Sequence, residues 1–188
     1  QRKESFLSRV GGKISSEWLL PKVMQILSED SEIYQEADQF VEAGDWIVHH
    51  LTGEWKRNSC AAGYKAGYVE GNGFYDSAFL QALDPRLADL DQKLSPVFPS
   101  GTLAGSVSAS AVRLYGFSPS TAVAVASIDA HVAVPAVGIV ESGKMLMILG
   151  TSTCHMLLSK QEIMVKGISG VVRDGIIPGF FGYEAGQA

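Results

Sequence analysis

Residues 120–131 read STAVAVASIDAH, a run of small and β-branched apolar residues that leads to an aspartate and a histidine. This run predicts a buried strand over 121–126, so that Asp129 follows the carboxyl end of the strand. Open α/β sheets bind their ligands at that edge. A carboxylate there can accept a proton from a substrate hydroxyl as a general base, although many strand-end aspartates only cap the following helix.

A second apolar run, KMLMIL at 144–149, leads through Gly150, Thr151 and Ser152 into a third run that ends at Ser159. The pattern predicts a β-hairpin with a small hydroxylated turn. A glycine followed by hydroxyl groups suits phosphate oxygens, and an ordinary hairpin turn explains it equally well. The turn lacks the lysine and the spacing of a Walker A loop, which argues against a P-loop enzyme.

The part of the chain before these strands is mainly helical by its pattern. We expect helices over 15–27, 31–41, 45–51, 74–83 and 106–115. The glycine-rich stretch 63–73 predicts instead a loop that approaches a ligand closely. Lys65 in this stretch is either a donor to a substrate or a solvated surface lysine.

Composition limits the classes of protein that fit. The chain has 188 residues, 46% of them hydrophobic and 19% charged, which suits one ordinary domain or one domain with part of another. The net charge of −5 gives no electrostatic reason to expect nucleic acid or an anionic membrane as a partner. No apolar stretch predicts a membrane span.

Cysteines and histidines point to neither a disulfide framework nor a metal site. Cys60 and Cys154 lie far apart, which fits a reducing, cytoplasmic setting. The four histidines fall in no known ligand spacing, so we expect no protein-ligated transition metal. Asp129 and Glu184 would also pass as a glycosidase carboxylate pair, because nothing in the sequence determines their separation.

Six stretches of the sequence together resemble the FGGY family of carbohydrate kinases. They are EAGDWI (42–47), LTG (51–53), CAAGYKA (60–66), IDAH (128–131), GTSTC (150–154) and PGFFGYEAGQ (178–187). They occur in the order of the family and cover most of the chain. The last three and CAAGYKA are most similar to the branch that phosphorylates L-ribulose.

This resemblance implies an α/β fold of the ribonuclease H-like type, shared with actin and hexokinase. Residues 1–140 would form the latter part of the N-terminal sugar-binding domain, and 141–188 the start of the C-terminal ATP-side domain. The boundary would lie near Gly138 to Gly143. Since a whole FGGY kinase has a first phosphate loop and an adenosine-binding half outside these stretches, we expect the 188-residue chain alone to be inactive.

The resemblance also assigns roles to individual residues. Asp129 corresponds to the catalytic base, which deprotonates the 5-hydroxyl of L-ribulose as it attacks ATP in the presence of Mg²⁺. Lys65 and Glu184, together with Asp129, correspond to contacts with the sugar. Gly150, Thr151 and Ser152 correspond to the hairpin against the ATP phosphates. His131 would orient Asp129 or line the sugar pocket, and packing explains it equally well.

Two alternatives stay open at this point. The enzyme would be another FGGY kinase, acting on D-ribulose, xylulose or a polyol, or the chain would be a non-catalytic sugar-binding module. The expected partners are a small sugar and ATP, with no nucleic acid and no membrane, and a homo-oligomer stays open.

Overall fold

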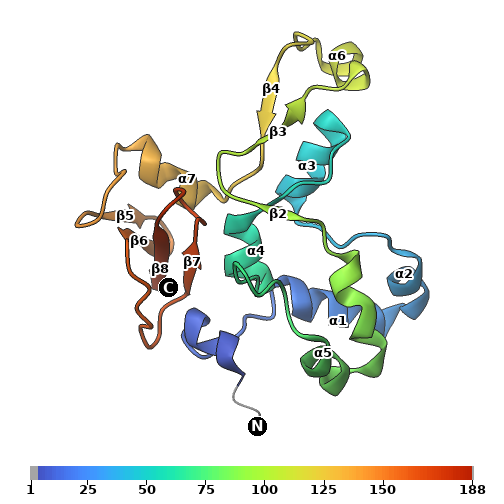
Figure 1. Cartoon of the computed structure of the whole chain (residues 1–188), viewed down its shortest axis with the longest axis horizontal. Helices are drawn as coiled ribbons and strands as arrows, with labels where there is room; N and C mark the ends of the chain where they lie inside the picture. Colours follow the sequence, from blue (N-terminus) through green and yellow to red (C-terminus); the bar gives the residue numbers. More distant parts are fainter. Residues whose placement is uncertain (1–3, 188) are drawn as a thin grey trace.

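The structure, a computed structural model, describes residues 4–187. Its first part is helical and carries two small β pairs (Figure 1). The two pairs are β1 with β2, which are parallel, and β3 with β4, which are antiparallel. The elements of this part are η1 (Ser5–Val10), α1 (Leu19–Glu29), α2 (Ser31–Glu36), α3 (Ala43–Thr52), β1 (Arg57–Asn58), α4 (Ser59–Ala66), α5 (Ser77–Leu83), η2 (Pro85–Lys93), β2 (Val97–Phe98), β3 (Leu103–Ser106), α6 (Ala109–Tyr115) and β4 (Ala122–Ala124).

The second part is a four-stranded antiparallel sheet with one helix beside it. Helix α7 (Asp129–Ala136) precedes the strands and packs against β6. The strand order is β5-β6-β8-β7. The strands are β5 (Met145–Leu149), β6 (Thr153–Ser159), β7 (Gly170–Arg173) and β8 (Phe181–Gln187).

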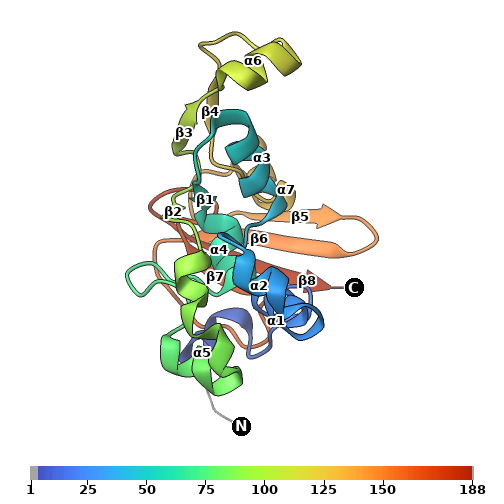
Figure 2. The ribbon, with the colours of Figure 1, turned by 90° about the vertical axis from the view of Figure 1, so that its right-hand side faces the viewer.

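Separate hydrophobic cores support the two parts. In the helical part, α1, α2, α5 and η2 bury Leu20, Val23, Leu80 and Leu87 among other apolar side chains. In the second part, Val134 of α7 packs with apolar side chains of the sheet. The β3–β4 ribbon and α6 extend away from both (Figure 2).

Several predicted elements are confirmed. The β-hairpin pairs Met145 with Leu157 and Leu149 with Thr153. The helix predicted over 15–27 is α1, and Pro21 lies in its first turn, where its missing N–H leaves no hydrogen bond unmade. The helices predicted over 45–51 and 106–115 are α3 and α6, and each ends at a glycine in the left-handed conformation.

Four helices are shorter than predicted: α1 and α6 begin at Leu19 and Ala109 rather than at residues 15 and 106, and α5 and α2 also differ. α5 begins at Ser77 rather than at residue 74, because Asp76 caps it. α2 ends at Glu36, because the Lys93 ammonium binds the carbonyl oxygen of Ala37 at 2.7 Å and the chain then becomes extended. That extension lets Phe40 stack on Tyr34 in the core, with ring centroids 5.5 Å apart.

The prediction of a loop over 63–73 is wrong for its first residues. Helix α4 continues through Gly63 and Lys65 and ends at Gly67. Gly63 is needed for close packing rather than for a turn, because a Cβ there would overlap the side chain of Val172 on β7. The remainder, residues 68–73, does form a turn, closed by a bridge between Val69 and Gly73.

The prediction of a buried strand over 121–126 is also wrong. β4 covers only Ala122–Ala124 and pairs with β3, and Ala122 and Ala124 are exposed. One face of this two-stranded ribbon packs on α3 through Val48 and Val125, which leaves the other face to solvent. Asp129 therefore does not follow a buried strand directly but begins α7 after a short connection.

Tyr64 of α4 joins the helical part to the sheet. Its side chain is 1% exposed and lies against backbone at Gly170, Gly175 and Gly182, where an added Cβ would collide with the phenol ring or, at Gly175, press tightly on it. A larger residue at Gly170 would push the helix from the sheet, and one at Gly182 would collide with the Ile176 side chain and the Tyr64 hydroxyl. The absence of side chains at the three glycines thus leaves the space that one buried aromatic ring fills.

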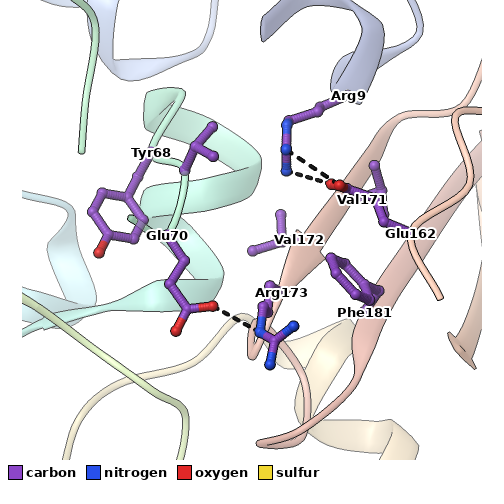
Figure 3. A pocket seen from close by; sticks show the side chains of 9 residues that line it. Arg9, Tyr68, Glu70, Glu162, Val171, Val172, Arg173 and Phe181 are labelled. Carbon is purple, nitrogen blue, oxygen red and sulfur yellow. Dashed lines mark hydrogen bonds and ion pairs between the residues drawn. The ribbon is translucent and has the colours of Figure 1, made fainter. Parts of the chain in front are cut away.

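Two ion pairs add a polar seam to the same junction (Figure 3). Arg9 of η1 pairs with Glu162, and Arg173 of β7 pairs with Glu70 at 2.8 Å. They flank a cavity of about 120 Å³ between η1, the 68–70 turn and the sheet. Because a carboxylate already neutralises each arginine, this cavity is a junction and not an anion site.

We expect Gly170→Ala to lower the free energy of unfolding by about 1 to 3 kcal/mol, because the new methyl group overpacks against Tyr64. Urea unfolding followed by circular dichroism measures the loss. Gly105→Ala in β3 is the matched control, since its methyl group would meet Thr52 at an ordinary 3.5 Å. Equal losses for the two variants would contradict the role of Tyr64.

Candidate functional site

Helices α4 and α7 and strand β8 meet at a cluster of Tyr64, His131 and Glu184. His131 is 1% exposed, and its Nε2 lies 3.2 Å from Oε2 of Glu184. The rings of His131 and Tyr64 are 4.3 Å apart. His131 therefore contacts the sequence-predicted sugar residue Glu184, and it is at the same time part of the packing around Tyr64.

The electrostatics of Glu184 follow from these neighbours. Burial alone raises the pKa of this carboxyl, but the hydrogen bond from His131 and the charges of His131 and Lys65 outweigh burial and leave the pKa below its ordinary value. Glu184 is therefore ionised at neutral pH and can only accept hydrogen bonds. The effect of Lys65 indicates that the two predicted sugar residues lie near one another.

Lys65 lines a cavity of about 280 Å³ between α3, α4 and the segment before α7. Glu42 and Asp45 of the α3 region face this cavity, as do Ser127 and Ile128. Burial raises the pKa of Glu42, against the lowering influence of Arg57 and Lys65. With Glu17, the walls thus combine a cation, three carboxylates and a hydroxyl, the groups that recognise polyhydroxylated ligands.

Asp129 is the first residue of α7 and is exposed. Its Oδ1 accepts the amide of Ala130 at 2.8 Å. Its position in the chain places it between Ile128, which lines the cavity, and the His131–Glu184 pair. The carboxylate is open to a ligand at the edge of the site.

The turn Gly150, Thr151, Ser152 is also exposed, and the amide of Gly150 donates to the carbonyl of Ser152 at 3.0 Å. Its link to α7 runs through one hydrophobic cluster, because Ala130 and Cys154 both pack against Met156 and its neighbours. The contacts of the described residues do not join the turn to Lys65 or Glu184. Its hydroxyls are free for phosphate oxygens.

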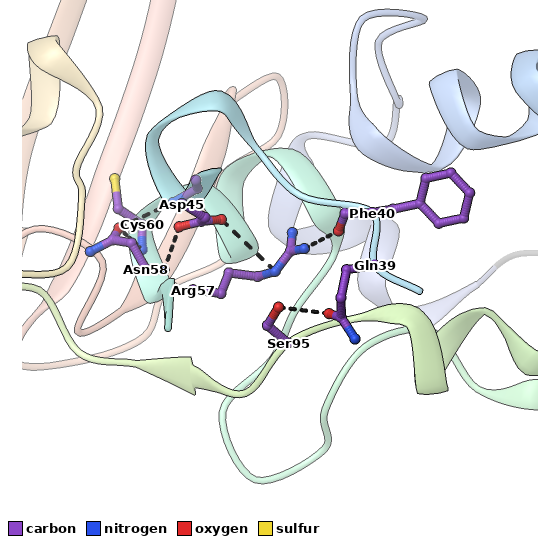
Figure 4. Close-up of polar contacts among 8 residues, drawn as sticks. Gln39, Phe40, Asp45, Arg57, Asn58, Cys60 and Ser95 are labelled. Atoms are coloured by element: carbon purple, nitrogen blue, oxygen red, sulfur yellow. Dashed lines mark hydrogen bonds and ion pairs between the residues drawn. The ribbon is translucent and has the colours of Figure 1, made fainter. Parts of the chain in front are cut away.

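A buried polar network supports the wall of the cavity (Figure 4). Arg57 is fully buried, lies 3.9 Å from Asp45 and donates to the carbonyl of Phe40. Asp45 also accepts the amide of Asn58 at 3.0 Å. The Asn58 side chain caps α4 by accepting from the amides of Cys60 and Ala61. The network therefore sets the start of the helix that carries Tyr64 and Lys65.

The cysteine and histidine side chains that could bind a metal are held in packing contacts instead. Burial raises the pKa of the Cys60 thiol to about 12, so the thiol remains protonated and is a poor metal ligand. His49 stacks on Trp55, and His50 stacks on Trp46. Within residues 4–187, no group of three or more His, Cys, Asp or Glu side chains is arranged to hold a metal ion. None of the helices in that range has the length and apolar character to cross a bilayer.

Sequence reasoning did not single out Tyr64, Glu42, Asp45 or Asn58 as site residues. All but Asn58 lie in two of the stretches that carry the resemblance, 42–47 and 60–66, so the motifs pointed to the right segments. What was missing was the contact between these segments. Asp45 and Asn58 are 13 positions apart in the sequence and share a hydrogen bond only in the fold.

A comparison with known families identifies the family of the chain. Residues 1–136 match the N-terminal domain of the FGGY family of carbohydrate kinases. The chain belongs to this family.

The chain is also similar to curated ribulokinases along its whole length. It is 53% identical to the ribulokinases of Shouchella clausii and Geobacillus thermodenitrificans, and 45% identical to that of Mycolicibacterium smegmatis. Each alignment covers 100% of this chain but only 34%, 34% and 33% of the relative. The chain thus spans about a third of the length of the curated relatives it matches.

Solved structures show the same fold. A xylulose kinase from Rhodospirillum rubrum aligns with a TM-score of 0.84 at 22% identity, over 100% of this chain and 37% of that one. Plasmodium falciparum glycerol kinase with ADP aligns with a TM-score of 0.73 at 13% identity, over 99% of this chain and 38% of that one. The chain therefore has the actin- and hexokinase-like α/β fold of the sugar kinases.

Because the pKa of Glu184 is lowered in the folded protein, the unfolding free energy should depend on pH through this residue. A carboxyl with a lower pKa in the folded state stabilises the fold fully above its unfolded value, near pH 4.5, and loses this contribution as the pH falls through the folded value. We expect the difference in unfolding free energy between the wild type and Glu184→Gln to shrink as the pH falls below about 4.5. Urea unfolding at a series of pH values measures it.

Glu141→Gln is the control, because Glu141 is exposed and pairs only with exposed Lys144. Its difference from the wild type should stay small at every pH. A difference for Glu184→Gln that does not change between pH 6 and 3 would contradict the coupling to His131 and Lys65.

Proposed function

We propose that this chain carries the sugar side and part of the phosphate side of a kinase that transfers the γ-phosphoryl group of ATP to the 5-hydroxyl of L-ribulose. The observation that supports it best is the placing of Lys65 and the His131–Glu184 pair around the segment that ends in Asp129. The 53% identity to ribulokinases supports the choice of sugar.

In this proposal Lys65 and Glu184 hold the ketopentose. The Lys65 ammonium donates to sugar oxygens from the wall of the cavity. The ionised Glu184 accepts from sugar hydroxyls. Such charge-assisted hydrogen bonds fix the orientation of a small polar ligand and distinguish a hydroxyl from its absence.

Asp129 acts as the general base. Its exposed carboxylate accepts the proton of the 5-hydroxyl while the sugar oxygen bonds to the γ-phosphorus, and the bond from that phosphorus to the bridging oxygen of ADP breaks. Phosphoryl transfer asks little covalent chemistry of a protein, so positioning and charge provide most of the acceleration.

The turn Gly150, Thr151, Ser152 lies along the phosphates of ATP: the Thr151 and Ser152 hydroxyls donate to them, and Gly150, whose amide closes the turn onto Ser152, allows the backbone to come close. Mg²⁺ neutralises phosphate charge when it is bound with the nucleotide. A nucleotide-bound magnesium ion takes most of its ligands from phosphates and water, so the donor set of this chain is compatible with it without a cluster of carboxylates.

The same proposal includes the division of the chain into two domains and the compartment in which the protein works. Residues 1–140 would form the latter part of the sugar-binding domain and 141–188 the start of the ATP-side domain. The two free cysteines, Cys60 and Cys154, support a reducing compartment such as the cytoplasm.

We expect Asp129→Asn to lower kcat for L-ribulose by about 10² to 10⁴-fold, because the amide cannot accept the proton. The KM for the sugar should change little, since the side chain keeps its shape. Coupled detection of ADP release, on the product of the complete reading frame that contains these residues, measures both constants.

Asp91→Asn, at an exposed position of η2, controls for loss of a surface charge. A normal kcat for Asp129→Asn would remove Asp129 as the base. If no ketose supports ADP release by the wild type, the kinase proposal itself fails and the sugar-binding module becomes the better account.

Lys65→Met keeps the apolar stem of the side chain and removes its charge. We expect the KM for L-ribulose to rise about tenfold or more, because a hydrogen bond to a charged donor is lost. The same steady-state assay with a panel of ketoses measures it, and Lys144→Met, an exposed lysine of the hairpin, is the control. A KM equal to that of the control would place Lys65 outside the sugar site.

A further inference from the structure

We infer that His131 is a positioning residue, whose buried imidazole holds one oxygen of Glu184 so that the other oxygen faces the sugar. This role rests on the proposed function, because it assigns a purpose to the sugar contact of Glu184. It separates His131 from Asp129, although the two residues are neighbours on the same helical turn.

The geometry aims the imidazole at Glu184. His131 lies in the first turn of α7, and its amide donates to the carbonyl of Ile128 at 3.0 Å, so the backbone is anchored. On one side the ring packs against Tyr64. On the other side Nε2 lies 3.2 Å from Oε2 of Glu184. The side chain is therefore held between an immobile ring and the carboxylate.

A packing role alone does not account for an imidazole at this position. Both ring nitrogens of His131 are buried: Nδ1 has no hydrogen-bond partner among residues 4–187, and the contact of Nε2 with Glu184 has the distance of an ion pair without the geometry of a hydrogen bond. Burying such an atom costs free energy that leucine or phenylalanine would not cost. The imidazole is thus a poor choice for filling space and a suitable one for directing a donor at a carboxylate.

The carboxylate of Glu184 is suited to being held by one oxygen. Its side chain is 17% exposed and stands on β8, where Met156 of β6 and Gly170 of β7 are its cross-strand neighbours. With Oε2 directed at His131, Oε1 remains as the acceptor for a sugar hydroxyl. A glutamate has three rotatable bonds, so fixing one oxygen lowers the entropy lost when the ligand binds.

Other titratable groups surround the pair from each packed element. Tyr64, Lys65 and Cys60 of α4 are close enough to interact electrostatically with Glu184, and Tyr183 precedes Glu184 on β8. The charge of Lys65 acts on Glu184 in the same direction as His131, although less strongly. Loss of His131 should therefore weaken the interaction with Glu184 without removing its ionisation at neutral pH.

The test compares three variants in the product of the complete reading frame. His131→Leu removes the donor and keeps an apolar side chain. His131→Gln retains an N–H donor at about the reach of Nε2. Val134→Ala is the matched control, because it alters the packing of the same helix on the sheet but leaves the contact with Glu184.

Two measurements are made on each variant. Carbon-detected NMR follows the titration of the Glu184 carboxyl and needs no substrate. Steady-state kinetics with L-ribulose gives kcat and KM separately.

We expect His131→Leu to raise the pKa of Glu184 and to raise the KM for L-ribulose about tenfold, with kcat within about threefold. His131→Gln should restore much of the KM, and Val134→Ala should leave both measurements near those of the wild type. A loss of stability alone would not divide the effect in this way between KM and kcat.

An unchanged pKa of Glu184 in His131→Leu would overturn the inference, and so would a raised pKa with an unchanged KM. A fall in kcat as large as the rise in KM would mean that His131 takes part in the proton transfer assigned to Asp129, and this would also overturn the inference. If the wild type itself accepts no ketopentose, the proposed function fails, and the assigned purpose of His131 fails with it.

Discussion

One buried side chain, Tyr64, connects the two parts of this protein. Its ring lies where α4 meets the sheet, and backbone at Gly170, Gly175 and Gly182 leaves space for it. Because the interior of a protein is close-packed, a ring in such a space has few alternative positions. The next residue, Lys65, is thereby directed toward the cavity, and His131 is brought against the ring from α7.

The polar groups behind this contact have a supporting role. Arg57 and Asp45 are buried together, and Asn58 links Asp45 to the first turn of α4. Removing one partner would leave the other charge buried and uncompensated, so the network favours a single arrangement of α3 and α4. The site thus combines an apolar joint with a polar anchor, and Lys65 lies on the helix between them. Glu184 approaches from the sheet.

Local sequence was sufficient where local forces decide the structure. The hairpin of β5 and β6 and the ends of α3 and α6 follow from alternation, turn chemistry and glycine at the last turn. It failed where a contact distant in sequence decides. The glycine at position 63 favoured a loop. In the fold it lies inside α4, where the side chain of Val172 leaves no room for a Cβ. The apolar run 121–126 predicted a buried strand, but β4 pairs only with β3 and only one face of this ribbon is covered.

For the site, the sequence was enough to indicate the family and the candidate groups, because the motifs around Lys65, Asp129, the 150–152 turn and Glu184 are short and contiguous. Which of these groups meet depends on how the chain folds. The fold placed His131 against Glu184, where α7 packs on the sheet. A pair separated by more than fifty positions has no local signature, because its energy arises only when packing brings both side chains out of water.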